Sequence, residues 1–417
     1  MASPAGWSVV EMPGDRAAVS SFTGTEDGVD LLLVGASVRY LAGWFIEAGY
    51  RPLALDLFAD RDLQALCPAK SIAREDWPDG LYEACEPYRG LPIVYAGGLE
   101  NAPKLLEKLA KNHPLWGNRA RVLGPARDLA QWTAILTEGG FQVPEWIPGP
   151  VGLQDDGKSS EVASEKARTI PEGNWLFKPY RGAGGLNIKD APLGKTIPAG
   201  YFAQRKIKGT GVSLSFSLGP GEPRFFLGAY EMPMIPALAS PAFAYRGSVV
   251  YRGMTLVMNA QGKALAHILK DKMGLRGLVG VDAISVDGHL RILEINPRPT
   301  ASMELADFGG GSALARWHVA AFLGANHALE NTLPREKPLA KAIWYADRNF
   351  RFPKEFAQEE IEKDLKIQLA DIPPGWQPMV EGEPILTIVL EESDPGRMIE
   401  RIEAAVAFLK KRLFPSS

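Results

Sequence analysis

The chain has 417 residues, of which 46% are hydrophobic and 23% are charged, with 43 glycines and 33 prolines. These values are ordinary for a globular enzyme and exclude a collagen, a disordered tail protein and a coiled coil, while the length predicts two to three domains. The net charge of −3 gives no basic footprint, so we expect no nucleic-acid partner.

The first hundred residues have the pattern of a parallel α/β domain. Leu31–Val34 is a short apolar run typical of a buried parallel strand, helical spacing follows from Val38, and Pro52–Leu57 is a second strand. Asp56 lies 21 residues after Gly35, a spacing seen in dinucleotide sites. The turn reads GASVRY and lacks the second and third glycines of that motif, so we discount a dehydrogenase and interpret Asp56 as the end of a strand.

The middle of the chain changes from helix to strand. A domain boundary is predicted near 115–124, followed by a helix with Pro125 at its first position and Gly139 at its end. The polar stretch 148–173 is predicted to be mainly loop, and strands dominate from 174, with one helix near 258–273. Near the C-terminus, GEPILTIVLEE predicts a strand and the next segment an amphipathic helix capped by Asp394 or Ser393.

The most informative segment is the predicted hairpin 280–304. Glu294 and Asn296 lie two apart on a strand, so their side chains share one face, whereas Leu293 and Ile295 are predicted to point into a core. Asp282 joins that face only if the hairpin has a three-residue loop at 286–288 with Gly288 in the left-handed position, which we predict. Two carboxylates and an amide suit Mg²⁺; the alternative is a solvated surface hairpin.

A second candidate site is an apolar strand that ends in Lys178 and is followed by Arg181-Gly182-Ala183-Gly184-Gly185. Glycine-rich backbone exposes N–H groups that bind phosphate, and a lysine at its edge adds positive charge. This is not a Walker A loop, and alone it favours an ordinary turn beside a surface lysine. Together with the downstream acidic strand it favours a phosphate site.

The combination of K-P, a glycine loop and a later E-x-N-P-R strand resembles the ATP-grasp proteins. The resemblance covers nearly the whole chain and implies an α/β and α+β architecture. It implies a Rossmann-like pre-ATP-grasp domain at 1–118, an ATP-grasp core of two α+β subdomains at 119–330, and a small C-terminal α+β module at 331–417. The same resemblance implies ATP and Mg²⁺ (or Mn²⁺) as cofactors.

The resemblance also implies roles for individual residues. Arg298 and Lys178 would stabilise the transferring phosphoryl group, and Asp282, Glu294 and Asn296 would bind the metal. ATP would contact Lys178, Leu293, Gly182, Ala183, Gly184, Gly185, the hinge residues Gln204, Arg205, Lys206 and Ile207, and Arg127, for which a solvated arginine is the equal alternative. Many members have a ribose-binding glutamate where this chain has Gly211, so the group that replaces it is an open question.

Members of the family mostly join a carboxylate to an amine through an acyl phosphate, releasing ADP and phosphate. The expected partners are therefore two small-molecule substrates, with Ser37, Arg39, Tyr245, Arg246 and Ser302 as candidate contacts. The EINPRPTASMEL stretch resembles ligases that attach glutamate to an amine in methanofuran-type cofactor synthesis, such as tyramine–glutamate ligase. An ATP-grasp kinase and a non-catalytic nucleotide-binding scaffold are the alternatives.

The cysteine content and hydropathy predict where such an enzyme works. Cys67 and Cys85 are the only cysteines, which excludes a disulfide scaffold and indicates a reducing compartment. The first residues lack the pattern of a signal peptide, and no apolar run of about 18 residues occurs that would span a membrane. We expect a cytoplasmic protein without a membrane partner; the oligomeric state is left open, with a homodimer as one possibility.

Overall fold

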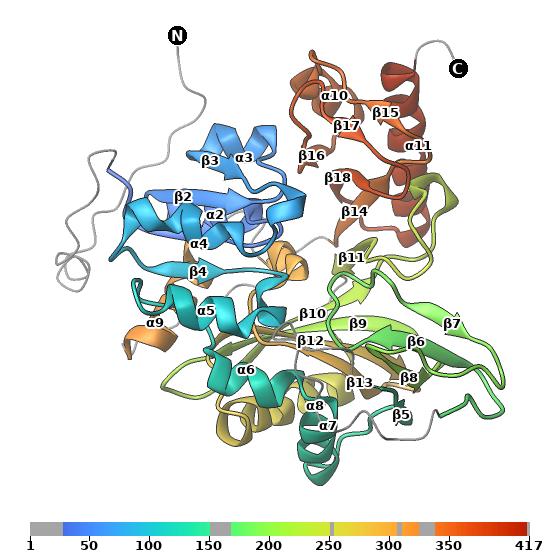
Figure 1. The fold of residues 1–417 in the computed structure, drawn as a ribbon. Helices are drawn as coiled ribbons and strands as arrows, with labels where there is room; N and C mark the ends of the chain where they lie inside the picture. Colours follow the sequence, from blue (N-terminus) through green and yellow to red (C-terminus); the bar gives the residue numbers. More distant parts are fainter. Residues whose placement is uncertain (1–27, 151–167, 251–253, 307–310, 325–337, 415–417) are drawn as a thin grey trace.

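The computed structural model describes residues 28–150, 168–250, 254–306, 311–324 and 338–414. The predicted loop is described only at its edges, since 151–167 lie outside these ranges, as does the predicted domain boundary at 330–331. Figure 1 shows an N-terminal α/β layer above the central sheets, with the C-terminal elements beside it. No helix in the described ranges has the length and apolarity needed to cross a membrane.

The N-terminal layer is a parallel sheet in the order β3-β2-β1-β4. Its apolar strands are completely buried in β1 (Leu31–Val34) and β2 (Pro52–Asp56), as expected for a sheet covered on both faces. The other elements are β3 (Ala69–Ser71), β4 (Ile93–Tyr95), α2 (Arg39–Glu47), α3 (Arg61–Leu66), α4 (Gly80–Cys85) and α5 (Pro103–Leu109). The carboxyl ends of β1, β2 and β4 bring Gly35, Asp56 and Gly97 to one edge, where α/β sheets usually bind ligands.

Two helices, rather than the single helix predicted from Pro125, connect this layer to the rest of the chain. Pro125 lies inside α6 (Ala120–Arg127), and α7 (Leu129–Glu138) starts anew after Asp128. The Asp128 backbone is extended and its carboxylate accepts from the Gln131 N–H at 3.0 Å, which is N-cap geometry. The prediction of a single helix that starts at Pro125 was therefore wrong. Pro125 lies within the first helix, and the capping residue Asp128 starts the second.

A small antiparallel sheet has the order β5-β8-β6-β7. Its strands are β5 (Trp146–Pro148), β6 (Trp175–Pro179), β7 (Lys189–Ala191) and β8 (Tyr201–Arg205). Trp175, Phe177 and Ala203 pack into a core on one face, which leaves Lys178 and Phe202 on the other. This second face forms one wall of the site described below.

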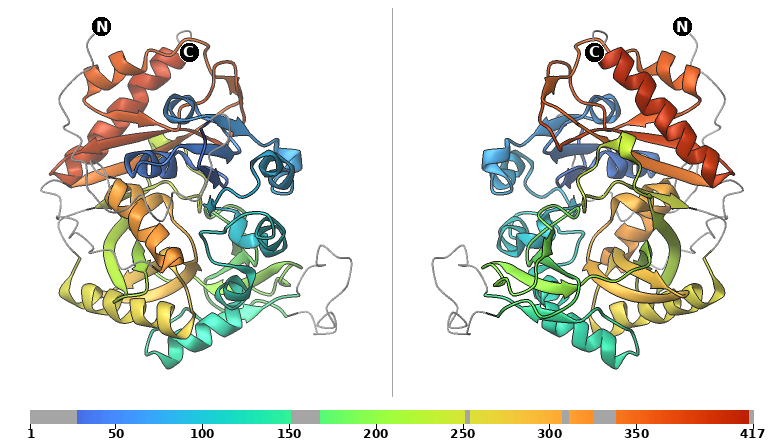
Figure 2. Two further views of the ribbon diagram at one scale, coloured as in Figure 1. Left: turned by 90° about the vertical axis from the view of Figure 1, so that its left-hand side faces the viewer. Right: turned by 90° about the vertical axis from the view of Figure 1, so that its right-hand side faces the viewer.

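The largest sheet in the described residues is antiparallel and has the order β13-β12-β9-β10-β11-β14-β18-β16. Its strands are β9 (Thr210–Leu218), β10 (Arg224–Glu231), β11 (Gly247–Val250), β12 (Gly277–Val286), β13 (His289–Asn296), β14 (Leu339–Tyr345), β16 (Gln368–Ala370) and β18 (Pro384–Glu391). The flanking elements are α8 (Leu256–His267), α9 (Ser312–Leu323), α10 (Gln358–Leu365), α11 (Pro395–Leu413) and a short pair, β15 (Phe350–Arg351) and β17 (Pro378–Met379). The α11 helix is capped by Asp394, as predicted. Because β14 pairs with β11, the C-terminal elements extend the central sheet (Figure 2).

The β12–β13 hairpin differs from its predicted turn. Val286 pairs with His289, so the loop has two residues, Asp287 and Gly288, both with positive φ (50° and 79°). The three-residue loop was therefore wrong, yet a bulge further along shifts the register so that Asp282 pairs directly with Glu294. The bulge also turns Leu293 out of the predicted core, where Ile292 takes its place.

Candidate active site

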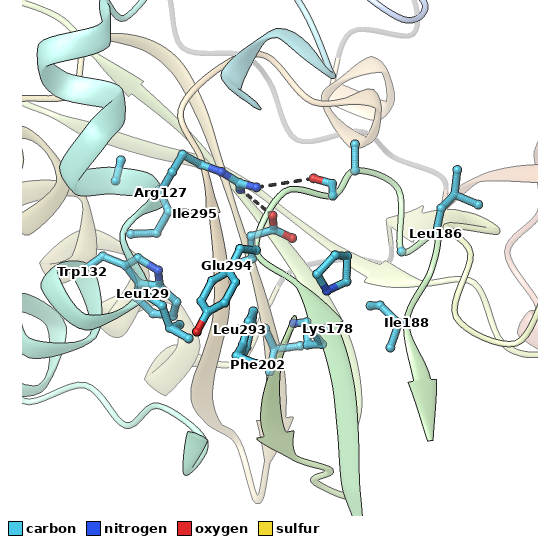
Figure 3. Close-up of a pocket in the computed structure, with 16 residues that line it drawn as sticks. Arg127, Leu129, Trp132, Lys178, Leu186, Ile188, Phe202, Leu293, Glu294 and Ile295 are labelled. Atoms are coloured by element: carbon cyan, nitrogen blue, oxygen red, sulfur yellow. Dashed lines mark hydrogen bonds and ion pairs between the residues drawn. The ribbon is translucent and has the colours of Figure 1, made fainter. Parts of the chain in front are cut away.

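A cavity lies between the small sheet and the β13 end of the large sheet. Its lining residues come from α6, α7, β6, β8, β13 and the glycine loop: Ala126, Arg127, Leu129, Trp132, Lys178, Pro179, Tyr180, Gly182, Ala183, Gly185, Leu186, Ile188, Phe202, Leu293, Glu294 and Ile295. Figure 3 shows apolar side chains on its walls, with Lys178, Glu294 and Arg127 pointing inward. The arrangement suits a flat apolar group joined to an anionic one.

Lys178 stands on β6 and contacts the neighbouring strand β8 of the same sheet. Its Nζ donates to Gln204 Oε1 at 3.1 Å, and Gln204 is buried with its Nε2 unpartnered among the described residues. Burial lowers the pKa of Lys178, while Glu294 and Asp282 oppose that shift by stabilising the charged form. The two predicted charge centres, the lysine and the acidic hairpin, therefore lie close enough to interact.

The glycine loop is held from two sides. The Gly182 carbonyl accepts from Asn101 Nδ2 at 3.1 Å and from Arg127 Nη2 at 3.4 Å, and the Gly184 carbonyl accepts from the Tyr245 N–H at 2.9 Å. Gly185 has φ +73°, and a Cβ there would lie 1.8 Å from the Phe243 carbonyl oxygen. The loop thus closes over the cavity through contacts with the N-terminal layer and with the segment before β11.

The predicted metal ligands share one face of the hairpin. Asp282 accepts from Ser213 Oγ at 2.7 Å and from Asn296 Nδ2 at 2.8 Å, and Glu294 Oε1 accepts from Arg127 Nη1 at 2.6 Å. Burial, followed by repulsion from Glu294, raises the pKa of Asp282. Two carboxylates that repel each other fit a divalent cation, although no group of three or more His, Cys, Asp or Glu side chains in the described part of the chain forms a metal site.

Arg298 is paired with a residue that the sequence did not suggest. Its Nε and Nη2 donate to Glu100 Oε1 at 2.8 and 2.7 Å, and Nη2 also contacts Asn296 Oδ1 at 3.2 Å. The Glu100 side chain has no exposed surface, and its Oε2 has no hydrogen-bond partner among the described residues. Burial opposes charge on both residues, but each lowers the cost for the other, so the pKa of Glu100 falls and that of Arg298 rises.

Glu100 and Asn101 are thus site residues that sequence reasoning missed. Both follow the Gly97-Gly98 turn at the carboxyl end of β4, and Asn101 also accepts from Arg127 at 2.9 Å. The signal that could have found them is position, since polar residues just past parallel strands are candidates for ligand sites.

The predicted hinge segment lies beside the cavity but does not line it, apart from the Gln204 contact with Lys178. The Arg205 and Lys206 N–H groups donate to the Glu145 and Asn174 carbonyls, and their side chains face Trp175 and Asp190. Those two N–H groups are already used by the protein. A role for this segment in binding adenine remains a prediction for its other backbone groups.

The space left by Gly211 is filled from the neighbouring strand. A Cβ on Gly211 would lie 2.3 Å from Glu231 Oε2, and Glu231 Oε1 pairs with Arg246 Nη2 at 2.9 Å. Strand register puts Ala229 beside Ser213, and Ser213 beside Asp282, so Glu231 shares the face of Asp282. An acidic side chain therefore occupies the expected region, supplied by β10 instead of β9.

The predicted substrate residues differ in the contacts that hold them. Tyr245 Oη and Ser248 Oγ lie 2.9 Å apart, and Ser302 Oγ lies 3.1 Å from Thr300 Oγ1, whereas Arg246 is held by Glu231. Ser37 is part-buried at the end of β1. Arg39 contacts three carboxylates, those of Asp62, Glu304 and Asp371, so it is fully occupied by the protein.

Comparison with known proteins identifies the fold. Residues 127–302 match the family model described as an ATP-grasp domain. Comparison with curated proteins gave no match. The chain has the ATP-grasp fold, as predicted, with the ATP-grasp domain in its central part.

Three solved structures illustrate the likeness. N5-carboxyaminoimidazole ribonucleotide synthetase from Thermus thermophilus is 18% identical with a TM-score of 0.60, and the match covers 92% of this chain and 98% of that chain. L-amino acid ligase from Bacillus licheniformis is 13% identical with a TM-score of 0.62, covering 91% and 97%. The biotin carboxylase domain of Hydrogenobacter thermophilus 2-oxoglutarate carboxylase, in complex with MgADP, ADP and bicarbonate, is 13% identical with a TM-score of 0.62, covering 90% and 89%.

Proposed function

We propose that the protein is an ATP-dependent ligase that joins a carboxylate to an amine through an acyl phosphate, releasing ADP and phosphate. The observation that supports it is the meeting of Lys178 on one sheet with the Asp282–Glu294 pair on the other, across a cavity closed by a glycine loop. Phosphoryl transfer needs positioning and charge stabilisation more than covalent help from the protein.

Each residue of the site has a place in this reaction. Lys178 would bind the phosphates, the 182–185 backbone would cover them, and Arg298, fixed by Glu100, would face the transferring phosphoryl group. Asp282, Glu294 and Asn296 would hold Mg²⁺, which neutralises phosphate charge when bound. The closed loop would exclude water, which is needed because an acyl phosphate hydrolyses readily.

The substrates are proposed from resemblance and neighbours. The 294–305 stretch resembles ligases that attach glutamate to an amine in one-carbon cofactor synthesis, and one structural neighbour is an L-amino acid ligase. We therefore propose L-glutamate as the first carboxylate to test and tyramine as the first amine.

An ADP-release assay with a panel of amino acids and amines tests the proposal. ADP should form only when a carboxylate and an amine are both present, with one amide per ADP by mass spectrometry. Release of AMP and pyrophosphate would refute it. A stable phosphorylated product without amide would establish a kinase, and MgATP binding without any turnover across the panel would favour a scaffold.

A further inference from the structure

Arg127, the last residue of α6, lines the cavity and bonds three separate parts of the protein. Its Nη1 donates to Glu294 Oε1 on β13 at 2.6 Å. Its Nη2 donates to Asn101 Oδ1 in the N-terminal layer at 2.9 Å and to the Gly182 carbonyl of the glycine loop at 3.4 Å. Figure 3 shows the Arg127 side chain reaching from its helix toward Glu294 and the loop. The acidic hairpin, the N-terminal layer and the loop therefore meet at one guanidinium.

The contact with Glu294 lies inside the proposed metal site. The Arg127 side chain is only 16% exposed and that of Glu294 is 36% exposed, so water screens the pair weakly on the arginine side. A charge-assisted bond of this length is strong. A divalent cation bound by Glu294 would have to share that carboxylate with the guanidinium, and two cations on one carboxylate repel each other.

The other proposed metal ligands also accept hydrogen bonds from the protein. Asp282 accepts from Ser213 Oγ at 2.7 Å and from Asn296 Nδ2 at 2.8 Å, and both donors are neutral. Asn296 Oδ1 accepts from Arg298 Nη2 at 3.2 Å, which places that cation on an amide. The guanidinium on Glu294 differs from these donors, because it brings a positive charge directly to a carboxylate of the site.

Arg127 also carries a donor that it does not use. Its Nε is buried and has no hydrogen-bond partner among the described residues. A guanidinium is a planar fork of N–H donors that matches phosphate, and a buried N–H without an acceptor is costly. Because Arg127 already bonds Gly182, a phosphate covered by the 182–185 backbone would lie beside the same guanidinium. An anionic ligand could therefore take the place of Glu294 as its partner.

Two arrangements of these charges leave none of them alone. In the first, seen in the structure, Arg127 pairs with Glu294. In the second, Arg127 pairs with a phosphate and Glu294 with a divalent cation. A cation alone would separate Arg127 from its anion, and removing one partner from a buried pair is costly. Nucleotide and cation should therefore each bind better when the other is present, and this coupling is reciprocal.

We propose that Arg127 is an internal counter-ion that holds Glu294 until a nucleotide binds, and then moves to the phosphates and releases that carboxylate to the metal ion. This rests on the proposed function, since it needs a nucleotide and a divalent cation as ligands. It deepens that function by making metal binding depend on nucleotide. The metal ion enters with the nucleotide or after it, and not before.

The test measures metal binding without any turnover. The full-length protein, free of nucleotide, is titrated with Mn²⁺, and electron paramagnetic resonance counts the free ion. Arg127→Met should bind Mn²⁺ at least fivefold more tightly than the wild type. Calorimetry then gives the affinity for ADP in EDTA and in saturating Mn²⁺, and the ratio of the two affinities is the coupling factor. We expect a factor of at least about ten in the wild type, within the usual range for coupled sites, and a factor at least fivefold smaller in Arg127→Met.

Two controls separate the contact from the loss of charge. Arg121→Met removes an exposed arginine from the same helix and should leave Mn²⁺ binding unchanged. Lys178→Met removes a cation of the cavity that donates to Gln204, so its effect should be smaller than that of Arg127→Met. Arg127→Lys keeps the charge, but one ammonium cannot reproduce the planar fork. It should still tighten Mn²⁺ binding at least twofold, which keeps the test open if Arg127→Met does not fold.

Three results would overturn the inference: unchanged Mn²⁺ affinity in both Arg127 variants, an equal effect of Lys178→Met, or a wild-type coupling factor near one. The proposed function fails in a different way. A protein that shows the coupling but releases no ADP with any pair of substrates would retain the inference and refute the ligase.

Discussion

The nucleotide cavity and a second group of charged residues differ in how their charge is compensated. We call this second group the junction cluster; its members are Arg39, Asp56, Asp60, Asp62, Glu304, Lys341 and Asp371. In the cavity, Arg127 pairs directly with Glu294 at 2.6 Å, and Lys178 stands on the other sheet near the charges of Glu294 and Asp282, so charges of opposite sign meet. In the junction cluster, acids outnumber bases, and the Asp60 side chain makes no capping hydrogen bond to α3. The difference indicates that the first region is prepared for a ligand of mixed charge, whereas the second keeps an excess of negative charge.

The largest expected effect concerns the acidic hairpin. Glu294→Gln removes one of two repelling carboxylates and should lower ADP release about 10²- to 10³-fold, in the range for losing one preorganised charge contact. Asp287→Asn, at the exposed tip of the same hairpin, is the control, since asparagine tolerates the positive φ of that position. If Glu294→Gln kept an activity within twofold of wild type, the carboxylate of Glu294 in the cavity would not take part in the reaction.

The Glu100–Arg298 pair should dominate stability on the N-terminal side of the cavity. Glu100→Gln leaves Arg298 as a buried cation without its anion, and we expect a loss of about 3–5 kcal/mol in the free energy of unfolding by urea. Glu83→Gln, an exposed residue of the same layer, should change it by less than about 0.5 kcal/mol. Equal effects would show that the pair is not energetically coupled to the fold.

A smaller effect is expected from the glycine loop. Gly185→Ala would place a methyl group against the Phe243 carbonyl, whereas Gly184→Ala has the same positive φ but open space around the new Cβ. Both variants incur about 1–2 kcal/mol for a left-handed alanine, so the difference between them isolates the contact. The KM for ATP should rise about tenfold more in Gly185→Ala, equivalent to about 1.4 kcal/mol.

The cavity could be predicted from sequence because its parts are local. Lys178 and its glycine loop are adjacent in the chain, and Asp282, Glu294 and Asn296 belong to one hairpin, whose period of two places them on one face. Even so, the predicted loop was wrong, and the correct face resulted from a bulge. The bulge leaves Leu293 of β13 without a partner on β12, and the period of two in the sequence does not encode it.

The junction cluster and Glu100 could not be predicted in the same way. Arg39 and Asp371 are 332 residues apart, and Arg298 and Glu100 are 198 apart, so their pairing depends on how three layers dock. Arg39, the first residue of α2, was predicted as a candidate for holding a substrate carboxylate. Its interpretation as a free substrate contact did not account for the acids that the C-terminal elements bring to it.

The position of Glu231 beside Gly211 gives a further test of the cavity as a nucleotide site. Glu231→Gln should raise the KM for ATP about fivefold, because a hydrogen bond to a charged group contributes about 1.5–3 kcal/mol and part of it is lost. The double change Gly211→Glu with Glu231→Gly moves the acid back to β9 and should recover most of the affinity. Gly211→Glu alone should fail, because the two side chains compete for one space.

The pH dependence of stability tests the junction cluster without any substrate. Burial, reinforced by Asp371, Asp62 and Asp56 and opposed by Arg39, raises the pKa of Asp60 to about 9 from its ordinary 3.8. Between these values the native chain holds a proton that the unfolded chain has released, so stability decreases as pH rises.

Relative to Asp60→Asn, the free energy of unfolding of the wild type should therefore fall by about 1 kcal/mol between pH 6 and 7. This is slightly less than the change expected if one whole proton were released on unfolding. Lys341 and Glu304 face the same cluster in both proteins, so the comparison with the variant cancels their contribution. Asp79→Asn, at the exposed N-cap of α4, should keep the wild-type slope. Parallel curves for wild type and Asp60→Asn would mean that Asp60 is already compensated within the protein, and the contrast between the two regions would then disappear.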